Sequence, residues 1–143
     1  MSAKNHTPGV LLLTAAIDTD PGMRNNQRSN SDLRRGDYKD GLKHYFSALP
    51  PEIEDILFCE NTGADLTDFE SMKEEAARAG RRLHIRGFKG QTPASLGKGV
   101  CEFEILDVAN RWLAERFPDE TPVWKITGRL ILRNVSALIR SRP

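Results

Sequence analysis

Residues 9–17, GVLLLTAAI, form a continuous apolar run that is followed by the turn-forming sequence DTDPG at residues 18–22. A strand with one exposed face alternates polar and apolar residues, whereas an unbroken apolar run is typical of a strand covered on both faces. Such strands occur in parallel sheets that carry helices on both sides. The run therefore predicts an α/β fold.

The rest of the chain alternates between helix and strand patterns. Helical spacing of apolar residues occurs in residues 32–49, 66–79, 100–117 and 134–142, and strand-like runs occupy residues 53–59, 81–88 and 122–132. Strict alternation predicts a parallel, doubly wound layer with right-handed crossovers. We expect a Rossmann-like, mostly parallel sheet of about four strands with helices on both faces, formed by residues 1–143 as a single domain.

Residues 23–31, MRNNQRSNS, show no periodicity and are predicted to form a mobile loop. Ser31 or Asp32 can then cap the first helix. In open α/β folds, the loop after the first parallel strand lies at the carboxyl edge of the sheet, where ligands bind.

The composition is that of an ordinary globular protein, with 38% hydrophobic and 29% charged residues and a net charge of +1. This balance argues against strong attraction to nucleic acid or to an anionic membrane. The longest apolar run is far shorter than the ~20 residues of a membrane span, and its flanks are not those of a signal peptide. Two cysteines make neither a disulfide framework nor a metal site, and Cys59 is expected to be a small core residue. We therefore expect a cytoplasmic protein.

Residues 122–132, PVWKITGRLIL, form an apolar strand pattern interrupted by Lys125, Thr127, Gly128 and Arg129. Charged side chains are costly to bury in an interior strand, yet one cation precedes the Thr-Gly pair and another follows it. Gly128 lets the backbone bend or lets a ligand approach it closely. The pattern predicts a core strand that delivers a cationic, Thr-bearing tip to a ligand site.

Polar residues follow each predicted strand. Because the carboxyl ends of parallel strands share one edge, we expect these groups to converge at a single rim. They are Asp18 with Asp20, Glu60 with Asn61, the loop through Lys98, and residues 125–129. Such a rim suits a phosphorylated, sugar-bearing ligand such as a nucleotide. A plainer interpretation is that Lys125 and Arg129 form ion pairs with Glu60 or Asp18.

Gly97-Lys98-Gly99 precedes a predicted helix but lacks the spacing of a phosphate-binding P-loop, since Thr92 stands where the first glycine belongs. Two interpretations remain: an anion-binding helix N-terminus with Lys98 as its charge, and a flexible turn with a solvated lysine. Glu102 and Glu104 lie two apart on a helix and point to different faces, so at most one faces the site. Either can instead stabilise the helix dipole.

No metal site is predicted. Asp18-Thr-Asp20 spells the DxD motif of metal-dependent enzymes, but it follows the first strand and is also good turn chemistry. His6, His44 and His84 are too scattered to form a ligand set, and His44 is expected to be solvated.

Several segments resemble a family of bacterial glycosyltransferases with a GT-A-like fold that take part in the synthesis of capsule, O-antigen and other surface polysaccharides. The matching pieces, in the family's order, are LLLTAAID, Arg34 with Tyr38, ILFCENTG, FKG, GKGVCEFEI and WKITGRLIL. The combination of GKG with K-x-T-G-R one helix later is the specific part of this resemblance.

The resemblance implies a nucleotide-sugar donor site along the rim. Thr14 and Asp18 would lie near the nucleotide, and Glu60 and Asn61 would lie under the base or ribose. Lys98 would contact the donor phosphates or the base.

The resemblance also implies a leaving-group role for Arg129, because a fixed guanidinium can stabilise the charge of a departing nucleoside diphosphate. In typical GT-A enzymes the corresponding strand carries DxD and a divalent metal, and here it carries TGR. The expected catalytic residues are Arg129, Lys125 and Glu104. The expected ligand-binding residues are Thr14, Asp18, Glu60, Asn61, Gly97, Lys98, Gly99, Thr127 and Gly128.

Two functions follow as expectations. The first is transfer of a sugar from a nucleotide-sugar donor to a polysaccharide or lipid-linked acceptor, with at most peripheral association with membrane-bound assembly machinery. The alternative is a non-catalytic or degenerate nucleotide-binding module, since DxD is missing and family members usually run past the TGR strand. A nucleic-acid binder is disfavoured, because aromatic residues are not interleaved with the basic ones.

Overall fold

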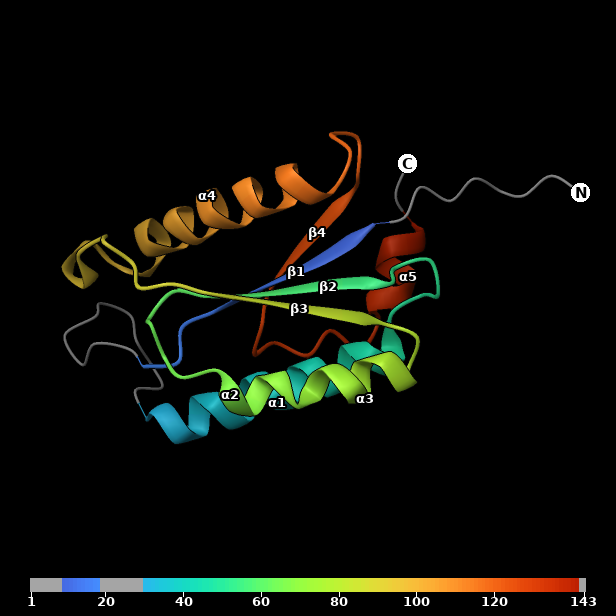
Figure 1. The fold of residues 1–143 in the computed structure, drawn as a ribbon, viewed down its shortest axis with the longest axis horizontal. Coiled ribbons are helices and arrows are strands. Elements are labelled where there is room, and N and C mark those ends of the chain that lie inside the picture. Colours follow the sequence, from blue (N-terminus) through green and yellow to red (C-terminus); the bar gives the residue numbers. More distant parts are fainter. Residues whose placement is uncertain (1–8, 19–29, 142–143) are drawn as a thin grey trace, which may run out of the picture.

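Four parallel strands form the centre of the protein (Figure 1). A computed structural model describes residues 9–18 and 30–141. The strands are β1 (Val10–Ala15), β2 (Asp55–Glu60), β3 (Arg82–Gly87) and β4 (Val123–Thr127), arranged in the order β3-β2-β1-β4. The predicted α/β class with a parallel, Rossmann-like sheet is confirmed.

Helices cover both faces of this sheet. They are α1 (Ser31–Ala48), α2 (Thr67–Glu70), α3 (Met72–Arg78), α4 (Lys98–Arg116) and α5 (Val135–Arg140), with a short 3-10 turn at Ala94–Leu96. Figure 1 shows α4 along one face and α1, α2 and α3 along the other. Among the described residues, no helix is both long and apolar enough to cross a membrane.

The central strand explains the apolar run at residues 9–17, because β1 is buried along its whole length. Leu11 and Leu13 pack into the core under α1, whereas Val10 and Leu12 pack into a second core under α4. Neither face of the strand meets water, so no polar alternation is needed.

The order of the strands creates a switch point beside β1. The chain runs outward from β1 to β2 and then to β3 at the edge, and α4 then carries it back to β4 on the other side of β1. In such sheets, ligands bind outside the carboxyl ends of the strands at the place where the direction of winding reverses. That place is the end of β1 next to the end of β4.

Two predicted helix boundaries are wrong. The side chain of Asn30, not that of Ser31 or Asp32, caps α1 by accepting a hydrogen bond from the Leu33 amide at 3.1 Å. The helix predicted for residues 66–79 is broken at Ser71 into α2 and α3. Residues 23–29 of the predicted mobile loop lie outside the described residues, as do Asp20 and Arg142.

The predicted strand 122–132 also ends early, at Thr127. Residues 128–132 leave the sheet and run along α1, where the Tyr45 hydroxyl donates to the Leu130 carbonyl at 2.5 Å and accepts from the Leu132 amide at 3.0 Å. His44 Nε2 lies 3.0 Å from the Leu132 carbonyl oxygen, so the expectation that His44 is solvated is wrong. We call residues 128–132 the strap.

A buried arginine ties the far end of α1 to the sheet. The Arg81 guanidinium donates hydrogen bonds to the carbonyls of Phe46, Leu49, Pro50 and Ile53 at 2.5–3.0 Å. The last carbonyls of a helix have no partner within the helix, so an arginine there satisfies groups that would otherwise be orphaned. Arg81 directly precedes β3 and thereby fixes the position of α1 relative to β2 and β3.

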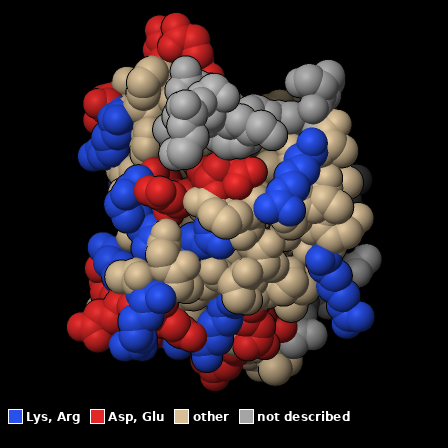
Figure 2. All heavy atoms as spheres, turned by 90° about the vertical axis from the view of Figure 1, so that its right-hand side faces the viewer, with Lys and Arg blue, Asp and Glu red and all other residues tan. Residues whose placement is uncertain are grey.

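The amino ends of the strands carry mixed charge. Figure 2 looks onto this end of the molecule, and basic and acidic side chains are interspersed over its left half. Part of this network is at the starts of β2 and β3, where Asp55 accepts two hydrogen bonds from Arg82, both at 2.9 Å, and lies 2.8 Å from His84 Nε2. Among the described residues of this face, opposite charges neutralise one another locally and produce no broad field of one sign.

Candidate functional site

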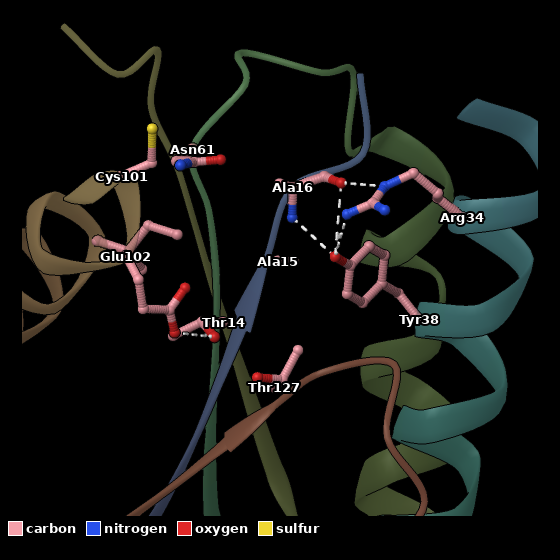
Figure 3. A pocket seen from close by; sticks show the side chains of 10 residues that line it. Thr14, Ala15, Ala16, Arg34, Tyr38, Asn61, Cys101, Glu102 and Thr127 are labelled. Carbon is pink, nitrogen blue, oxygen red and sulfur yellow. Dashed lines mark hydrogen bonds between the residues drawn. The ribbon is translucent and has the colours of Figure 1, made fainter. Parts of the chain in front are cut away.

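A small pocket lies at the switch point between β1 and β4 (Figure 3). The ends of the strands, the first half of α1 and the start of α4 all contribute to it. Its lining residues are Thr14, Ala15, Ala16, Arg34, Tyr38, Asn61, Cys101, Glu102, Ile105 and Thr127. The volume within the pocket that the centre of a water molecule can occupy is about 20 Å³. The pocket therefore has room for one water-sized group.

One wall of the pocket presents hydrogen-bond acceptors. Glu102 Oε1 accepts a hydrogen bond from the Thr14 hydroxyl at 2.7 Å and forms an ion pair with Lys125 Nζ at 2.5 Å. No donor among the described residues reaches Glu102 Oε2, and the buried Oδ1 of Asn61 also has no partner there. This wall therefore has two acceptor oxygens that can receive hydrogen bonds from a ligand.

The opposite wall is cationic. The buried Arg34 donates from Nε to the Ala16 carbonyl at 2.6 Å and from a terminal nitrogen to the Tyr38 hydroxyl at 3.1 Å. The same hydroxyl accepts from the Ala16 amide at 2.9 Å. Burial raises the pKa of Tyr38 in spite of the nearby charges of Arg34 and Arg129, so the phenol remains neutral and holds the end of β1 in place.

Arg129 lies on the strap and is not one of the lining residues, but its charge acts on Tyr38, which is one of them. Its side chain is half-buried, and its Nε is buried without a hydrogen-bond partner among the described residues. The carboxylates in the described part of the chain form no ion pair with it, although its charge acts on Tyr38. A guanidinium that is partly removed from water without a counter-ion is costly, and a bound anion would relieve that cost.

Glu60 is placed at the rim, but its carboxylate is fully used within the protein. Its side chain is entirely buried, and the four donors are the amides of Ile17, Thr62 and Ala64 and the Thr62 hydroxyl, at 2.6–3.3 Å. A carboxylate has about four acceptor positions, and all of them are occupied. Glu60 organises the loops after β1 and β2, so ribose could bind to it only by displacing one of these donors.

Glu104, one of the three expected catalytic residues, does not line the pocket. Its carboxylate accepts from the amides of Gln91 and Thr92 at 2.9–3.2 Å, and these hydrogen bonds lower its pKa. The sequence limited the site to at most one of Glu102 and Glu104, and the structure places Glu102 there. Glu104 instead anchors the loop between β3 and α4.

The absence of a side chain at Gly128 allows the strap to contact β1 and α1 closely. It does not serve the approach of a ligand. Its amide donates to the Thr14 carbonyl at 2.8 Å, and a Cβ at this position would lie 2.9 Å from the Thr14 oxygen. A Cβ on Gly41 of α1 would lie only 2.3 Å from the Gly128 carbonyl oxygen. The two glycines therefore let the strap pass between β1 and α1.

The remaining expected residues are dispersed. Gly97, with φ +96°, and Gly99 mark the start of α4, and Lys98 is its first residue. Asp18 is exposed, and its amide donates to the Thr62 hydroxyl at 3.1 Å. Lys125 pairs with Glu102 and not with Glu60 or Asp18, which corrects the ion pairs suggested for it.

The sequence prediction omitted Glu102 from the site residues, although a signal for it was present. Glu102 precedes Ile105 by three positions and Ala109 by seven, so it shares the face of α4 that packs on the sheet. Cys59 is buried as expected, and burial raises its pKa to about 12, so its thiol stays protonated. In the described part of the chain, no three His, Cys, Asp or Glu side chains are grouped so that they could hold a metal ion.

Comparisons of the chain with protein-family models, with curated proteins and with solved structures found no match. The resemblance to glycosyltransferases therefore remains a hypothesis that rests on the motifs themselves.

Proposed function

We propose that this protein binds a nucleotide-sugar at the β1–β4 switch point and transfers its sugar to a glycan or lipid-linked acceptor. Arg129 carries the proposal, because it offers a half-buried guanidinium that forms no ion pair within the described part of the chain, beside the place where parallel sheets bind ligands. A diphosphate supplies the charge that this guanidinium lacks, and bidentate hydrogen bonds suit the pair.

The chemistry follows from the charge of the leaving group. The bond between the anomeric carbon and the diphosphate oxygen breaks, and the nucleoside diphosphate departs with the electron pair. An acceptor hydroxyl forms the new glycosidic bond and loses its proton. Arg129 stabilises the diphosphate as its negative charge grows, and this effect lowers the barrier only if the guanidinium is held in place beforehand.

Lys125 plays a supporting part in this proposal. Its ammonium is held 2.5 Å from Glu102, so its charge is largely neutralised before any ligand binds. It fixes the orientation of Glu102, and Arg129 supplies the main attraction for phosphate.

Thermal-shift measurements with UDP-, GDP-, CMP- and dTDP-sugars, with and without Mg²⁺ or Mn²⁺, test the binding step. We expect at least one of these donors to raise the melting temperature in a concentration-dependent manner. Arg129→Ala should abolish the shift, Arg129→Lys should retain part of it, and the exposed Arg133→Ala serves as the matched control. Absence of a shift with every donor contradicts the proposal.

The second candidate is a nucleotide-binding module without transferase activity. It is favoured by the fact that Glu60 and Glu104 both use their carboxylates to hold backbone amides, which leaves neither free to act as a base. Donor turnover decides between the two. Release of free nucleotide or sugar transfer that Arg129→Ala eliminates without loss of stability supports the enzyme, and binding without turnover supports the module.

The cytoplasm is the compartment that we propose. Both cysteines are buried as free thiols, which fits a reducing environment.

A further inference from the structure

The two walls of the pocket have opposite chemistry. Two oxygen acceptors that have no donor among the described residues, Glu102 Oε2 and Asn61 Oδ1, lie on the side formed by α4 and the end of β2. The guanidinium of Arg34 lies on the side formed by α1, and the charge of Arg129 on the strap acts on Tyr38 of the same side. Figure 3 shows Glu102 and Asn61 on one side of the pocket and Arg34 and Tyr38 on the other.

The acceptor wall disfavours phosphate. A carboxylate and an amide oxygen both repel an anion, and the Lys125 ammonium beside Glu102 is already paired with it. A buried acceptor without a donor is also unfavourable in itself. Groups that donate hydrogen bonds and carry no negative charge satisfy this wall. The space inside the pocket holds one water-sized group, so one hydroxyl group can enter it while the rest of the ligand lies outside.

The acidic residue that usually binds the ribose hydroxyls in such sheets is not available for this role here. In dinucleotide-binding sheets, an acidic residue after β2 accepts hydrogen bonds from the ribose hydroxyls. The residue at that position here is Glu60, and four donors of the protein already occupy its carboxylate. Glu102 comes from a different element and reaches the same crevice, and its Oε2 accepts no hydrogen bond from the residues that the structure describes.

We propose that the pocket recognises a vicinal diol of the nucleotide-sugar, with one hydroxyl donating to Glu102 Oε2 and the other to Asn61 Oδ1, while the diphosphate lies on Arg129. This inference rests on the proposed function and adds the orientation of the ligand. The diol belongs either to the ribose of the nucleotide or to the sugar that is transferred, since both present adjacent hydroxyl groups.

Calorimetric titration with matched ligands tests the assignment. UDP is compared with 2′-deoxy-UDP, and GDP with 2′-deoxy-GDP, to detect recognition of the ribose. UDP-glucose is compared with UDP, and GDP-mannose with GDP, to detect recognition of the transferred sugar. We expect at least one of these pairs to differ by about tenfold in Kd, the size of one well-formed hydrogen bond.

Two variants remove the acceptors separately. Glu102→Gln and Asn61→Leu should each reduce the preference within the responding pair to about twofold or less, while binding of inorganic pyrophosphate stays unchanged. Arg133→Ala is the control, because this exposed residue does not line the pocket, and the variant should retain the preference. The ratio within a pair is informative even if a variant is less stable, since a general loss of folded protein affects both ligands equally.

The outcomes separate this inference from the proposed function. If nucleotides bind through Arg129 but no pair shows a preference, or if Glu102→Gln and Asn61→Leu leave the preference intact, the diol assignment is overturned and the nucleotide site stands. If no nucleotide binds to the wild-type protein, both are overturned.

Discussion

At the scale of single residues, the fold depends both on glycines, which lack a side chain, and on buried charged side chains. Gly41 and Gly128 lie opposite one another where the strap passes α1, and neither position has room for a Cβ. Glu60 and Arg81 illustrate the complementary case, because each is a buried charged side chain whose hydrogen bonds all go to neighbouring backbone or hydroxyl groups. Buried charge is tolerated at both positions because the hydrogen-bonding capacity is used.

Gly41→Ala tests the contact with the strap. The new methyl group would lie 2.3 Å from the Gly128 carbonyl oxygen, so α1 or the strap has to move. We expect a loss of about 1–3 kcal/mol in the free energy of unfolding, measured by urea denaturation. Gly36→Ala is the matched control on the same helix, where no atom lies within 4 Å of the added Cβ, and it should stabilise by up to ~1 kcal/mol. Equal stability of the Gly41 variant and wild type would refute the close contact.

Asp55 predicts a dependence of stability on acid pH. Burial alone would raise its pKa, but hydrogen bonds from Arg82 and His84 outweigh this effect and hold the pKa below its ordinary value. The folded protein therefore favours the charged form of Asp55. The contribution of this carboxylate to the free energy of unfolding is complete above the unfolded-state pKa of about 3.9, and it is lost as the pH falls through the lower folded-state pKa.

The measurement is the difference in unfolding free energy between wild type and Asp55→Asn. We expect this difference to be largest near pH 5 and to shrink steadily towards pH 2. Asp107→Asn, which breaks the exposed pair between Asp107 and Arg111, is the control and should show a small difference throughout. A difference for Asp55→Asn that is constant or grows with acidity would contradict the assignment.

At the scale of elements, the positions of α1 and α4 determine the site. α1 supplies Arg34 and Tyr38 to the pocket, holds the strap through Tyr45 and is fastened at its other end by Arg81. α4 turns Glu102 towards the sheet and Glu104 towards the preceding loop. The orientation of each helix about its axis therefore decides which of its polar residues face the ligand.

Arg81→Met tests the attachment of α1. Removal of the guanidinium takes one donor from each of four carbonyls near the end of α1, of which Pro50 retains the Ile53 amide, and we expect a loss of about 2–4 kcal/mol in unfolding free energy. Arg78→Met, an exposed change three positions earlier, should have an effect within ~0.5 kcal/mol. Amide hydrogen exchange should show faster opening at residues 45–53 in the Arg81 variant only. Similar behaviour of the two variants would refute the role given to Arg81.

At the scale of the whole molecule, the alternation of patterns was sufficient to predict the parallel α/β sheet. The unbroken run at residues 9–17 corresponds to a strand with a core on each side. The early end of β4 was not predictable from the apolar residues that follow, because Leu130 and Ile131 are exposed and the strap is held by hydrogen bonds to Tyr45. The hydrogen bonds that Glu60 accepts from the loops after β1 and β2 also could not be predicted, since they depend on the path of the backbone around its carboxylate.

The pairing of β1 with β4 has a consequence for folding kinetics. Val10 lies beside Val123, so this half of the sheet closes a loop that contains most of the chain, and such long-range pairing is slow to form. The pocket contains residues of both strands and is therefore expected to be completed late, after the folding barrier. A ligand bound there should slow unfolding and leave the refolding rate nearly unchanged, and stopped-flow measurements with and without nucleotide would detect the difference.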